Sequence, residues 1–289
     1  MSKAKQLRET IARRGLARVM AAHSPLSARL AEEAGFDGIW ASGFELSALY
    51  GLPDVSLISM TQHLDMTRAM AAQTCLPIIA DIDTGFGNAI NVIHAVKEYE
   101  RAGAAGVVIE DKSFPKVTSL VEGGRQDLVP IKEFQGKISA AIECRTNLDF
   151  LIIARTEALI AGLGEAEALA RALAYEEAGA DMILVHSKQD TPAEIESFVR
   201  NWQGKAPIVI VPTSYPEMTE EGALALGKIK VLIYGNHAIR ASIQAMQDSF
   251  ANIIKHGGAH EIGNDIASVK EVFRLQKMDQ IKENEDRYL

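Results

Sequence analysis

Short apolar runs that end in polar residues recur eight times along the chain. Each run is rich in Val, Ile and Leu, as expected for a strand buried on both faces of a sheet. The runs are Ala17–Ala22, Asp37–Ser42, Pro77–Asp83, Ala105–Asp111, Asp149–Arg155, Asp181–Ser187, Pro207–Thr213 and Lys230–Asn236. Segments of helical period, such as Ala89–Gly103 and Glu165–Gly179, lie between them. This alternation predicts parallel strands joined by right-handed crossovers.

A recurring Ala-Gly pair indicates where several of these helices end. Gly35, Gly103 and Gly179 each precede the next apolar run by a short step, and each suits the left-handed position that follows a helix. Eight strand–helix units close naturally into a (β/α)8 barrel of the TIM type. A doubly wound open sheet is the alternative, but no Gly-x-Gly-x-x-Gly motif follows an early strand, so we favour the barrel.

The length of the chain, 289 residues, suits one barrel domain spanning residues 1–289. Two helical segments, Ala238–His256 and Ser268–Glu285, follow the eighth run, although a barrel needs only one helix there. We therefore expect C-terminal helices over about residues 238–285 to serve a contact between subunits, and they are candidates for exchange between subunits.

Two connections are longer than simple joints between a strand and a helix. Gly43–Met60 follows the second run, and Lys112–Pro130 follows the fourth. Loops of this length are often lids or binding loops. We predict a gating loop at about residues 112–130, where Lys116 and Arg125 could close on an anion or remain solvated surface charges.

The composition narrows the choice of partners. Acidic residues exceed basic ones, 38 to 30, and this argues against a nucleic-acid or anionic-membrane surface. The charged N-terminus does not resemble a secretory signal, and no apolar stretch is long enough to span a bilayer. The two cysteines, Cys75 and Cys144, suggest neither a disulfide framework nor a thiolate metal site. We expect a cytoplasmic protein that acts on a small molecule.

Polar residues stand at the carboxyl ends of the apolar runs. In a barrel these ends share one face, which is where the active site lies. The residues are His23, Ser42, Asp81, Asp83, Glu110, Asp111, Arg155, His186, Thr213 and Asn236. Their gathering on one face predicts a polar, functional mouth.

The motif DIDTGFGN contains the strongest candidate for a metal site. Asp81 and Asp83 share one face of a strand, so their carboxylates repel each other unless a hard cation such as Mg²⁺ binds them. Glu110 and Asp111 end the next strand and add further carboxylates. A capping pair of aspartates before a glycine-rich turn is the alternative, but the additional carboxylates favour a metal.

Two candidate groups could bind an anion. Arg155 follows FLIIA, and a cation inside a barrel is costly unless it meets an anion. It could clamp a carboxylate or phosphonate in bidentate fashion, or form a structural salt bridge to Glu110 or Glu157. His186 could donate to a substrate oxygen, and Trp40 could either form a wall of the pocket or pack inside the barrel.

Three motifs in chain order, DIDTGFGN, VVIEDKSFPK and IIARTEA, resemble the phosphoenolpyruvate mutase / isocitrate lyase superfamily. The resemblance extends over almost the whole chain. It implies that Asp81 binds Mg²⁺ directly, with Asp83 and Glu110 acting through its waters, and that Mn²⁺ or Co²⁺ could substitute. It also implies a homo-oligomer, since tetramers built as a dimer of dimers are usual in this superfamily.

The same resemblance assigns the substrate contacts. The candidate catalytic residues are Asp54, Thr118, Arg155 and His186. The candidate substrate-binding residues are Trp40, Ser42, Gly43, Phe44, Lys116, Ser119, Arg155 and His186. Lys116, Thr118 and Ser119 fall on the gating loop of the superfamily, and Asp54 matches an aspartate near the reacting group.

The gating loop distinguishes the branches of the superfamily. Isocitrate and methylisocitrate lyases carry a catalytic Cys there, whereas this chain reads FPKVTSL, so a C–C lyase or a 2-oxo-acid hydrolase is disfavoured. The mutases that act on P–C bonds read Lys-Thr-Asn-Ser, and Thr118 stands where that Asn would be. This departure resembles the hydrolytic enzymes of that branch. We expect Mg²⁺-dependent cleavage of phosphonopyruvate to pyruvate and phosphate.

Two alternatives remain open. A phosphoenolpyruvate mutase would use the same site to interconvert phosphoenolpyruvate and phosphonopyruvate, and only Thr118 separates the two activities in the sequence. A non-enzymatic barrel that binds a carboxylic acid is disfavoured, because the candidate site is intact. Its residues are Asp81, Asp83, Glu110, Arg155 and His186.

Overall fold

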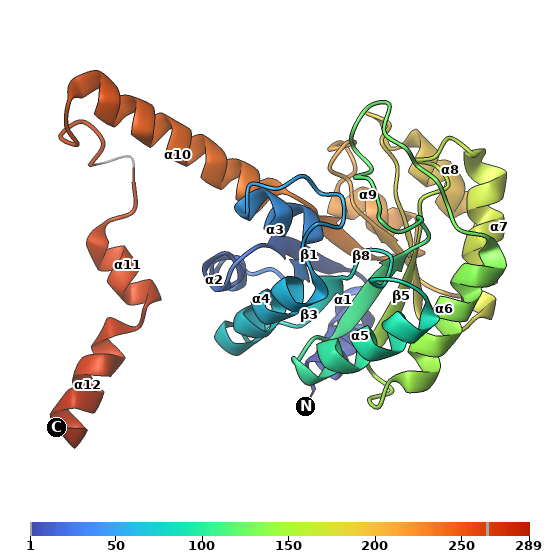
Figure 1. The fold of residues 1–289 in the computed structure, drawn as a ribbon, viewed down its shortest axis with the longest axis horizontal. Coiled ribbons are helices and arrows are strands. Elements are labelled where there is room, and N and C mark those ends of the chain that lie inside the picture. The colour runs from blue at the N-terminus through green and yellow to red at the C-terminus, as the bar shows by residue number, and fades with distance from the viewer. Residues whose placement is uncertain (1, 264–265) are drawn as a thin grey trace. The chain divides into compact units, whose positions relative to one another are not determined.

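The computed structural model describes residues 2–263 and 266–289. The chain forms two compact units, Met1–His237 and Ala238–Leu289. The first unit is a closed barrel in which every pair of neighbouring strands is parallel and the strands follow in chain order (Figure 1). This arrangement confirms the predicted (β/α)8 fold.

Each predicted apolar run overlaps one strand of the barrel, although β5 and β8 each extend one residue beyond their runs. The strands are β1 Ala17–Ala22, β2 Gly38–Ala41, β3 Ile78–Asp81, β4 Gly106–Glu110, β5 Leu151–Thr156, β6 Met182–Val185, β7 Ile208–Ile210 and β8 Ile229–Tyr234. Most strands are shorter than the runs that predicted them, because most residues at the two ends of a run belong to the adjoining loops.

Helices surround the strands, as Figure 1 shows. They are α1 Lys3–Arg14, α2 Pro25–Glu33, α3 Gly43–Leu49, α4 Met60–Gln73, α5 Ala89–Arg101, α6 Ile131–Cys144, α7 Gly164–Glu177, α8 Ala193–Asn201 and α9 Glu220–Ala225. The glycines predicted to end helices, Gly35, Gly103 and Gly179, have φ angles of 87°, 88° and 102°. These left-handed conformations suit residues that lack a Cβ atom.

The apolar core has two layers, as expected for strands buried on both faces. Side chains such as Val19, Ile79 and Ile153 fill the barrel interior together with Leu7 of α1. A second layer between the strands and the outer helices includes Tyr99. Because α1 contributes to the interior layer beside the early strand residues, it closes the amino-terminal end of the barrel and leaves the carboxyl end for function.

The predicted gating loop, residues 112–130, contains no helix or strand. Its two ends are joined by an antiparallel bridge between Lys112 and Leu128 and by a bond from Val129 N to Asp111 O of 2.9 Å. The loop is therefore fixed at its base. The other long connection, residues 43–60, is only partly irregular because it contains α3.

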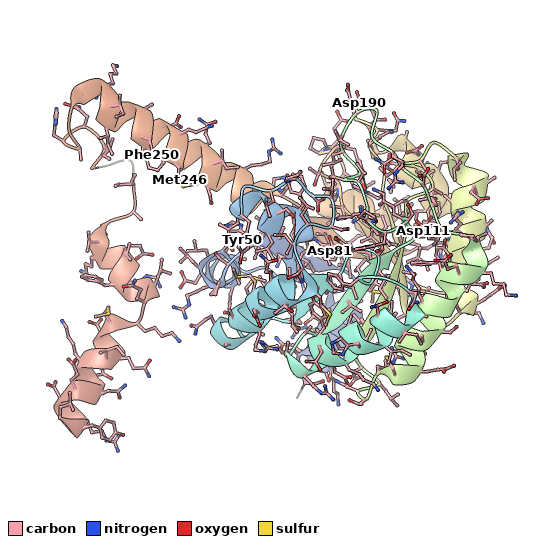
Figure 2. All side chains as sticks on the ribbon, in the orientation of Figure 1. Tyr50, Asp81, Asp111, Asp190, Met246 and Phe250 are labelled. Carbon is pink, nitrogen blue, oxygen red and sulfur yellow. The ribbon has the colours of Figure 1, made fainter. Side chains whose placement is uncertain are left out.

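The helices of the second unit are α10 His237–His256, whose first residue belongs to the first unit, α11 Val269–Leu275 and α12 Met278–Tyr288. The prediction of a single helix over Ser268–Glu285 was wrong, because Lys277 adopts a left-handed conformation with φ 57° and separates α11 from α12. In α10 only Ile239 is buried, whereas Met246 and Phe250 are 47% and 61% exposed (Figure 2). None of the described helices is both long and apolar enough to cross a membrane.

Candidate active site

A cavity opens at the carboxyl ends of the strands. Most residues predicted for the site line it, and they come from positions spread over the chain. The lining residues are Trp40, Ser42, Phe44, Asp54, Asp81, Lys116, Thr118, Ser119, Leu120, Arg155, His186, Val211, Thr213, Gly235 and Asn236. The barrel therefore brings together polar groups that the sequence separates by more than a hundred residues.

Three predicted residues lie beside this cavity instead of lining it. Gly43 and Asp83 line a smaller cavity, to which Asp54 and Asp81 also contribute. Glu110 lies 3.4 Å from Arg155, measured from its Oε2 to the guanidinium Nε, and is 1% exposed. Asp54 and Asp81 thus stand between the two cavities.

The start of α3 is placed tightly against the aspartates. Ser42 caps the helix, with its hydroxyl accepting from the amide of Glu45 at 3.1 Å. A Cβ atom at Gly43 would lie 3.2 Å from Oδ1 of Asp83 and 3.8 Å from Oδ2 of Asp81. Glycine therefore allows the backbone to approach these carboxylates closely.

The acidic residues at the ends of β3 and β4 are buried and have few hydrogen-bond partners. Asp81 is 6% exposed, and burial raises its pKa to about 6. Burial likewise raises the pKa of Glu110 to about 7. Within the described residues, neither carboxylate oxygen of Glu110 accepts a hydrogen bond. Buried carboxylates in this state favour a positive partner.

Lys116 of the gating loop already supplies one positive charge. Its ammonium lies 2.7 Å from Asp83 Oδ1 and 3.2 Å from Asp54 Oδ1, and the residue is 5% exposed. Burial alone lowers the pKa of Lys116, but Asp54 and Asp83 raise it well above its ordinary value. The loop therefore lies over the site and is held there by ion pairs.

The carboxylate oxygens near the cavity suit a hard divalent cation that takes few ligands from the protein. Across residues 2–263 and 266–289, no three His, Cys, Asp or Glu side chains are placed to hold a metal ion together. Mg²⁺ commonly takes one or two carboxylates and keeps waters or substrate oxygens as its other ligands. Asp81, with its oxygens facing the cavity, is suited to that single direct role.

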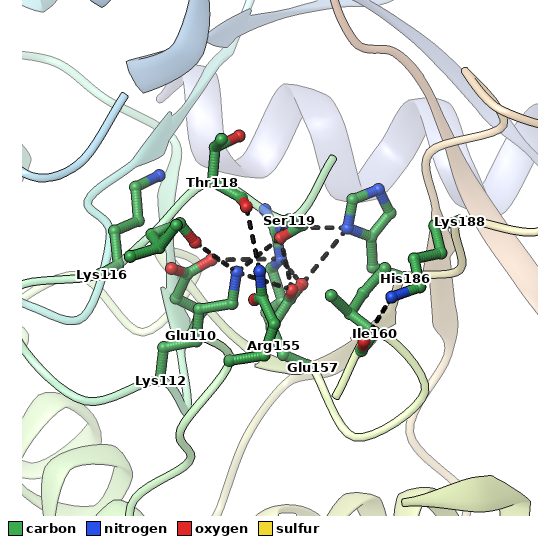
Figure 3. Close-up of polar contacts among 12 residues, drawn as sticks. Glu110, Lys112, Lys116, Thr118, Ser119, Arg155, Glu157, Ile160, His186 and Lys188 are labelled. Carbon is green, nitrogen blue, oxygen red and sulfur yellow. Dashed lines mark hydrogen bonds and ion pairs between the residues drawn. The ribbon is translucent and has the colours of Figure 1, made fainter. Parts of the chain in front are cut away.

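Arg155 and His186 form the cationic side of the cavity. Arg155 Nη2 lies 3.1 Å from Ser119 Oγ and 3.0 Å from His186 Nδ1 (Figure 3). Burial lowers the pKa of His186, and the charge of Arg155 lowers it further, so the ring is neutral near pH 7. When its Nδ1 accepts from Arg155, the ring proton stands on Nε2, where it can be donated to an anion.

Glu157 belongs to this site, although the sequence suggested it only as a possible structural partner of Arg155. It is fully buried, and its Oε1 lies 2.5 Å from Arg155 Nε. Burial raises the pKa of Glu157, but Arg155 and Lys112 outweigh this effect and hold the pKa well below its ordinary value. Its position two residues after Arg155, on the same side of the chain, was the available signal.

Other polar residues at the strand ends have different positions. Asp111 accepts from Tyr175 at 2.7 Å and from Arg171 at 3.2 Å, so it anchors α7 and does not enter the cavity. Arg125 is an exposed residue near Asp127, at 3.5 Å, and corresponds to a surface charge. Thr213 and Asn236 line the cavity, which the sequence indicated only by their places at strand ends.

The sequence pattern of the Phosphoenolpyruvate phosphomutase family matches residues 7–254. The chain belongs to the phosphoenolpyruvate phosphomutase family. This membership confirms the superfamily resemblance inferred from the three motifs.

Several named proteins are similar to this chain over nearly their whole length. Phosphonopyruvate hydrolase of Variovorax sp. (strain Pal2) is 55% identical over 289 residues, 100% of both chains. Phosphoenolpyruvate phosphomutase of Tetrahymena pyriformis is 44% identical, over 99% of this chain and 95% of that one. The crystal structure of phosphonopyruvate hydrolase with oxalate and Mg²⁺ has a TM-score of 0.94 at 53% identity, and covers 100% of this chain and 99% of that chain.

Proposed function

We propose that this chain is a phosphonopyruvate hydrolase, an enzyme that cleaves the P–C bond of phosphonopyruvate to give pyruvate and phosphate. The observation that carries the proposal is Thr118, which lines the cavity from the gating loop beside Lys116 and Ser119. The similarity to the Variovorax hydrolase, 55% over the full chain, supports the same reaction.

The charges of the site support Mg²⁺ as the cofactor. Its carboxylates, Asp54, Asp81, Asp83, Glu110 and Glu157, outnumber its permanent cations, Lys112, Lys116 and Arg155, by two. One divalent cation at Asp81 offsets this excess, with Asp83 and Glu110 acting through its waters. When bound, Mg²⁺ supplies Lewis-acid stabilisation of the enolate that forms as the P–C bond breaks. Mn²⁺ or Co²⁺ are expected substitutes.

The protein groups bind and orient a substrate that carries two acidic groups. Arg155 engages Glu157, Ser119 and His186 through Nε and Nη2, and within the described residues no acceptor is bonded to its Nη1. That nitrogen, with Nε2 of His186, is placed to hold an anionic oxygen. We assign Ser42, Gly43 and Phe44 to the other acidic group, and Trp40 to the wall behind it.

The reaction needs a water molecule held close to the phosphorus atom. The P–C electron pair moves to the carbon side as pyruvate enolate, the water oxygen bonds to phosphorus, and a proton ends on the enolate carbon. We assign Thr118 to hold that water, and Asp54 to accept a proton near the reacting group. Lys116 and Ser119, 5% exposed each, exclude bulk water beneath the loop.

Supplying phosphonopyruvate and Mg²⁺ and following pyruvate, phosphate and phosphoenolpyruvate together tests the proposal. Equal amounts of pyruvate and phosphate are expected. Conversion mainly to phosphoenolpyruvate would make the chain a mutase, the activity named for the Tetrahymena relative. Wild-type protein freed of metal by EDTA is the control, and it should be inactive.

We further propose that the chain assembles as a homotetramer, a dimer of dimers, through its C-terminal unit. On α10, the exposed apolar residues Ile243, Met246, Phe250 and Ile254 are spaced three or four residues apart, which places them on one face. We propose that this face packs against another copy of the chain, because subunits of a symmetric homo-oligomer contact each other through the same self-complementary surfaces. The free thiol of the exposed Cys75 suits a reducing compartment, so we place the enzyme in the cytoplasm.

A further inference from the structure

The carboxylate of Glu157 lies against Arg155 and His186 with one oxygen and against Ser119 and Lys112 of the gating loop with the other (Figure 3). Oε1 accepts from Arg155 Nε at 2.5 Å and lies 3.3 Å from His186 Nδ1. While Nδ1 accepts from Arg155 Nη2 at 3.0 Å, Glu157 acts on His186 through Arg155. Oε2 accepts from Ser119 Oγ at 2.5 Å and lies 3.2 Å from Lys112 Nζ. One side chain therefore contacts both the anion-binding groups and the loop that covers them.

The gating loop completes the hydrogen bonds of these buried charges. Ser119 Oγ donates to Glu157 and accepts from Lys112 Nζ at 2.7 Å and from Arg155 Nη2 at 3.1 Å. Lys112 Nζ also donates to the carbonyl of Val117 at 2.8 Å. With Glu157, these contacts use all three ammonium donors of Lys112, so two positions of the loop are held at one buried lysine.

Opening the loop would remove Ser119 and the Val117 carbonyl from charges that are nearly inaccessible to solvent. Glu157 is 0% exposed and Lys112 is 1% exposed. A buried charge that loses a partner is destabilised strongly, and so are the charges that depended on it. The closed loop and the ordered Arg155 side chain are therefore stabilised together.

We propose that Glu157 is a positioning residue that couples closure of the gating loop to the orientation of Arg155 and His186, with Lys112 as the anchor of the loop. Glu157 lines neither cavity, so it acts through its neighbours and not on the substrate. Only the predicted change in KM depends on the proposed function. The predicted change in loop movement does not, because that movement is measured without turnover of a substrate.

The first test is Glu157→Gln, compared with Glu165→Gln in the first turn of α7, whose partner is Asn201 at 2.7 Å. The amide replaces one acceptor oxygen by a donor, which then faces a cation on one side. Amide hydrogen exchange of residues 113–121 is first measured in the wild type with and without Mg²⁺ and oxalate. The variants are then compared with the wild type in whichever of these two conditions protects the wild-type loop more. Exchange in Glu157→Gln should be faster by about tenfold or more, and unchanged in the control.

Lys112→Met and Ser119→Ala remove partners of Glu157 Oε2 and leave the contact between Oε1 and Arg155 in place, so they test the loop side of the Glu157 carboxylate separately. Both should speed loop exchange, whereas Lys112→Met should raise KM for phosphonopyruvate less than Glu157→Gln does, because Oε1 still orients Arg155. The double variant Ser119→Ala, Glu157→Gln should exchange less than multiplicatively faster than the two single variants, since both residues belong to one hydrogen-bonded network.

Wild-type loop exchange in a folded Glu157→Gln protein would overturn the coupling, as would fully multiplicative effects in the double variant. If Glu157→Gln does not fold, Lys112→Met and Ser119→Ala decide, and exchange at the wild-type rate in both would reject it. A wild-type protein that does not turn over phosphonopyruvate, but whose variants show these exchange rates, would reject the proposed function and support the coupling.

Discussion

The buried carboxylates at the barrel mouth link protons to metal binding. Asp81 and Glu110 have pKa values raised by burial to about 6 and about 7. A protonated carboxyl is neutral and binds Mg²⁺ weakly, so protons and the metal compete for these groups. The same burial that makes the charges costly therefore sets the pH range in which the site accepts its cofactor.

Mg²⁺ affinity should fall as the pH is lowered from about 8 to about 6. Because folding raises both pKa values, protonation stabilises the metal-free protein. This contribution is complete below the unfolded pKa of about 4 and disappears as the pH rises through about 6 and about 7. The increase in Tm on adding Mg²⁺ should therefore grow with pH. Asp81→Asn should abolish this increase and the activity, and an Mg²⁺-dependent Tm shift retained in that variant would remove Asp81 from the metal site.

The planar guanidinium of Arg155 should be necessary, beyond its charge. The guanidinium of Arg155 contacts Glu157, Ser119 and His186 through two of its nitrogens and keeps the third for an anion. The single ammonium nitrogen of a lysine cannot make all of these contacts. Arg155→Lys should lower kcat/KM for phosphonopyruvate by about 10- to 100-fold, as expected for the loss of charge-assisted hydrogen bonds. The same exchange at Arg68, an exposed partner of Asp65 on α4, is the control and should leave kcat/KM unchanged. Wild-type efficiency in Arg155→Lys would make Arg155 a structural residue.

Thr118 should decide the fate of the phosphoryl group. Thr118 lines the cavity, and a hydroxyl can hold one water within about 2.6–3.2 Å, whereas a larger amide can exclude it. Thr118→Ala should lower kcat with a smaller change in KM, and Thr118→Asn should suppress phosphate release and allow some phosphoenolpyruvate to form. Phosphorus NMR separates these products. Thr118→Ser keeps the hydroxyl and serves as the matched control, and equal losses in Ser and Ala variants would argue against a water-holding role.

At the scale of elements, the gating loop should respond to ligand. Lys116 is buried against Asp54 and Asp83, so trypsin can cut after it only when the loop opens. Mg²⁺ and oxalate should slow this cleavage, because closure then shields the bound anion. Cleavage after the exposed Lys205 is the internal reference and should not change. Equal rates of cutting after Lys116 with and without ligand would contradict a lid.

The elements differ in how far the sequence predicts them. The eight strands were predictable because buried parallel strands are short and apolar, and strand β1 begins and ends where its run does. The break at Lys277 was not, because helical patterns continue on both sides of it. The contact between Lys112 and Glu157 could not be predicted from the sequence either, since it joins residues that follow different strands and depends on how the loop folds back.

At the scale of the whole molecule, the barrel unit and the C-terminal unit obey different constraints. The barrel buries its apolar residues internally, from Leu7 in α1 to Ile233 in β8. In α10, by contrast, the apolar residues are mostly exposed, and α11 and α12 contain no buried residue among those described. Exposed apolar faces of this kind are typical of surfaces that bind another protein chain. Sequence periodicity predicted helical structure in this region, although not the division between α11 and α12, and periodicity does not show what covers the exposed faces.

We expect the C-terminal unit to hold the oligomer together. Light scattering coupled to size-exclusion chromatography should give a mass of four chains for the wild type. Phe250→Glu and Met246→Glu place charges on the apolar face of α10, where burial of an unpaired charge is costly, so each should yield smaller species. Lys255→Glu changes the charge of the same helix at a residue off that face, and should leave the mass unchanged. A monomeric wild type, or a tetramer that persists in Phe250→Glu, would show that this face does not join the subunits.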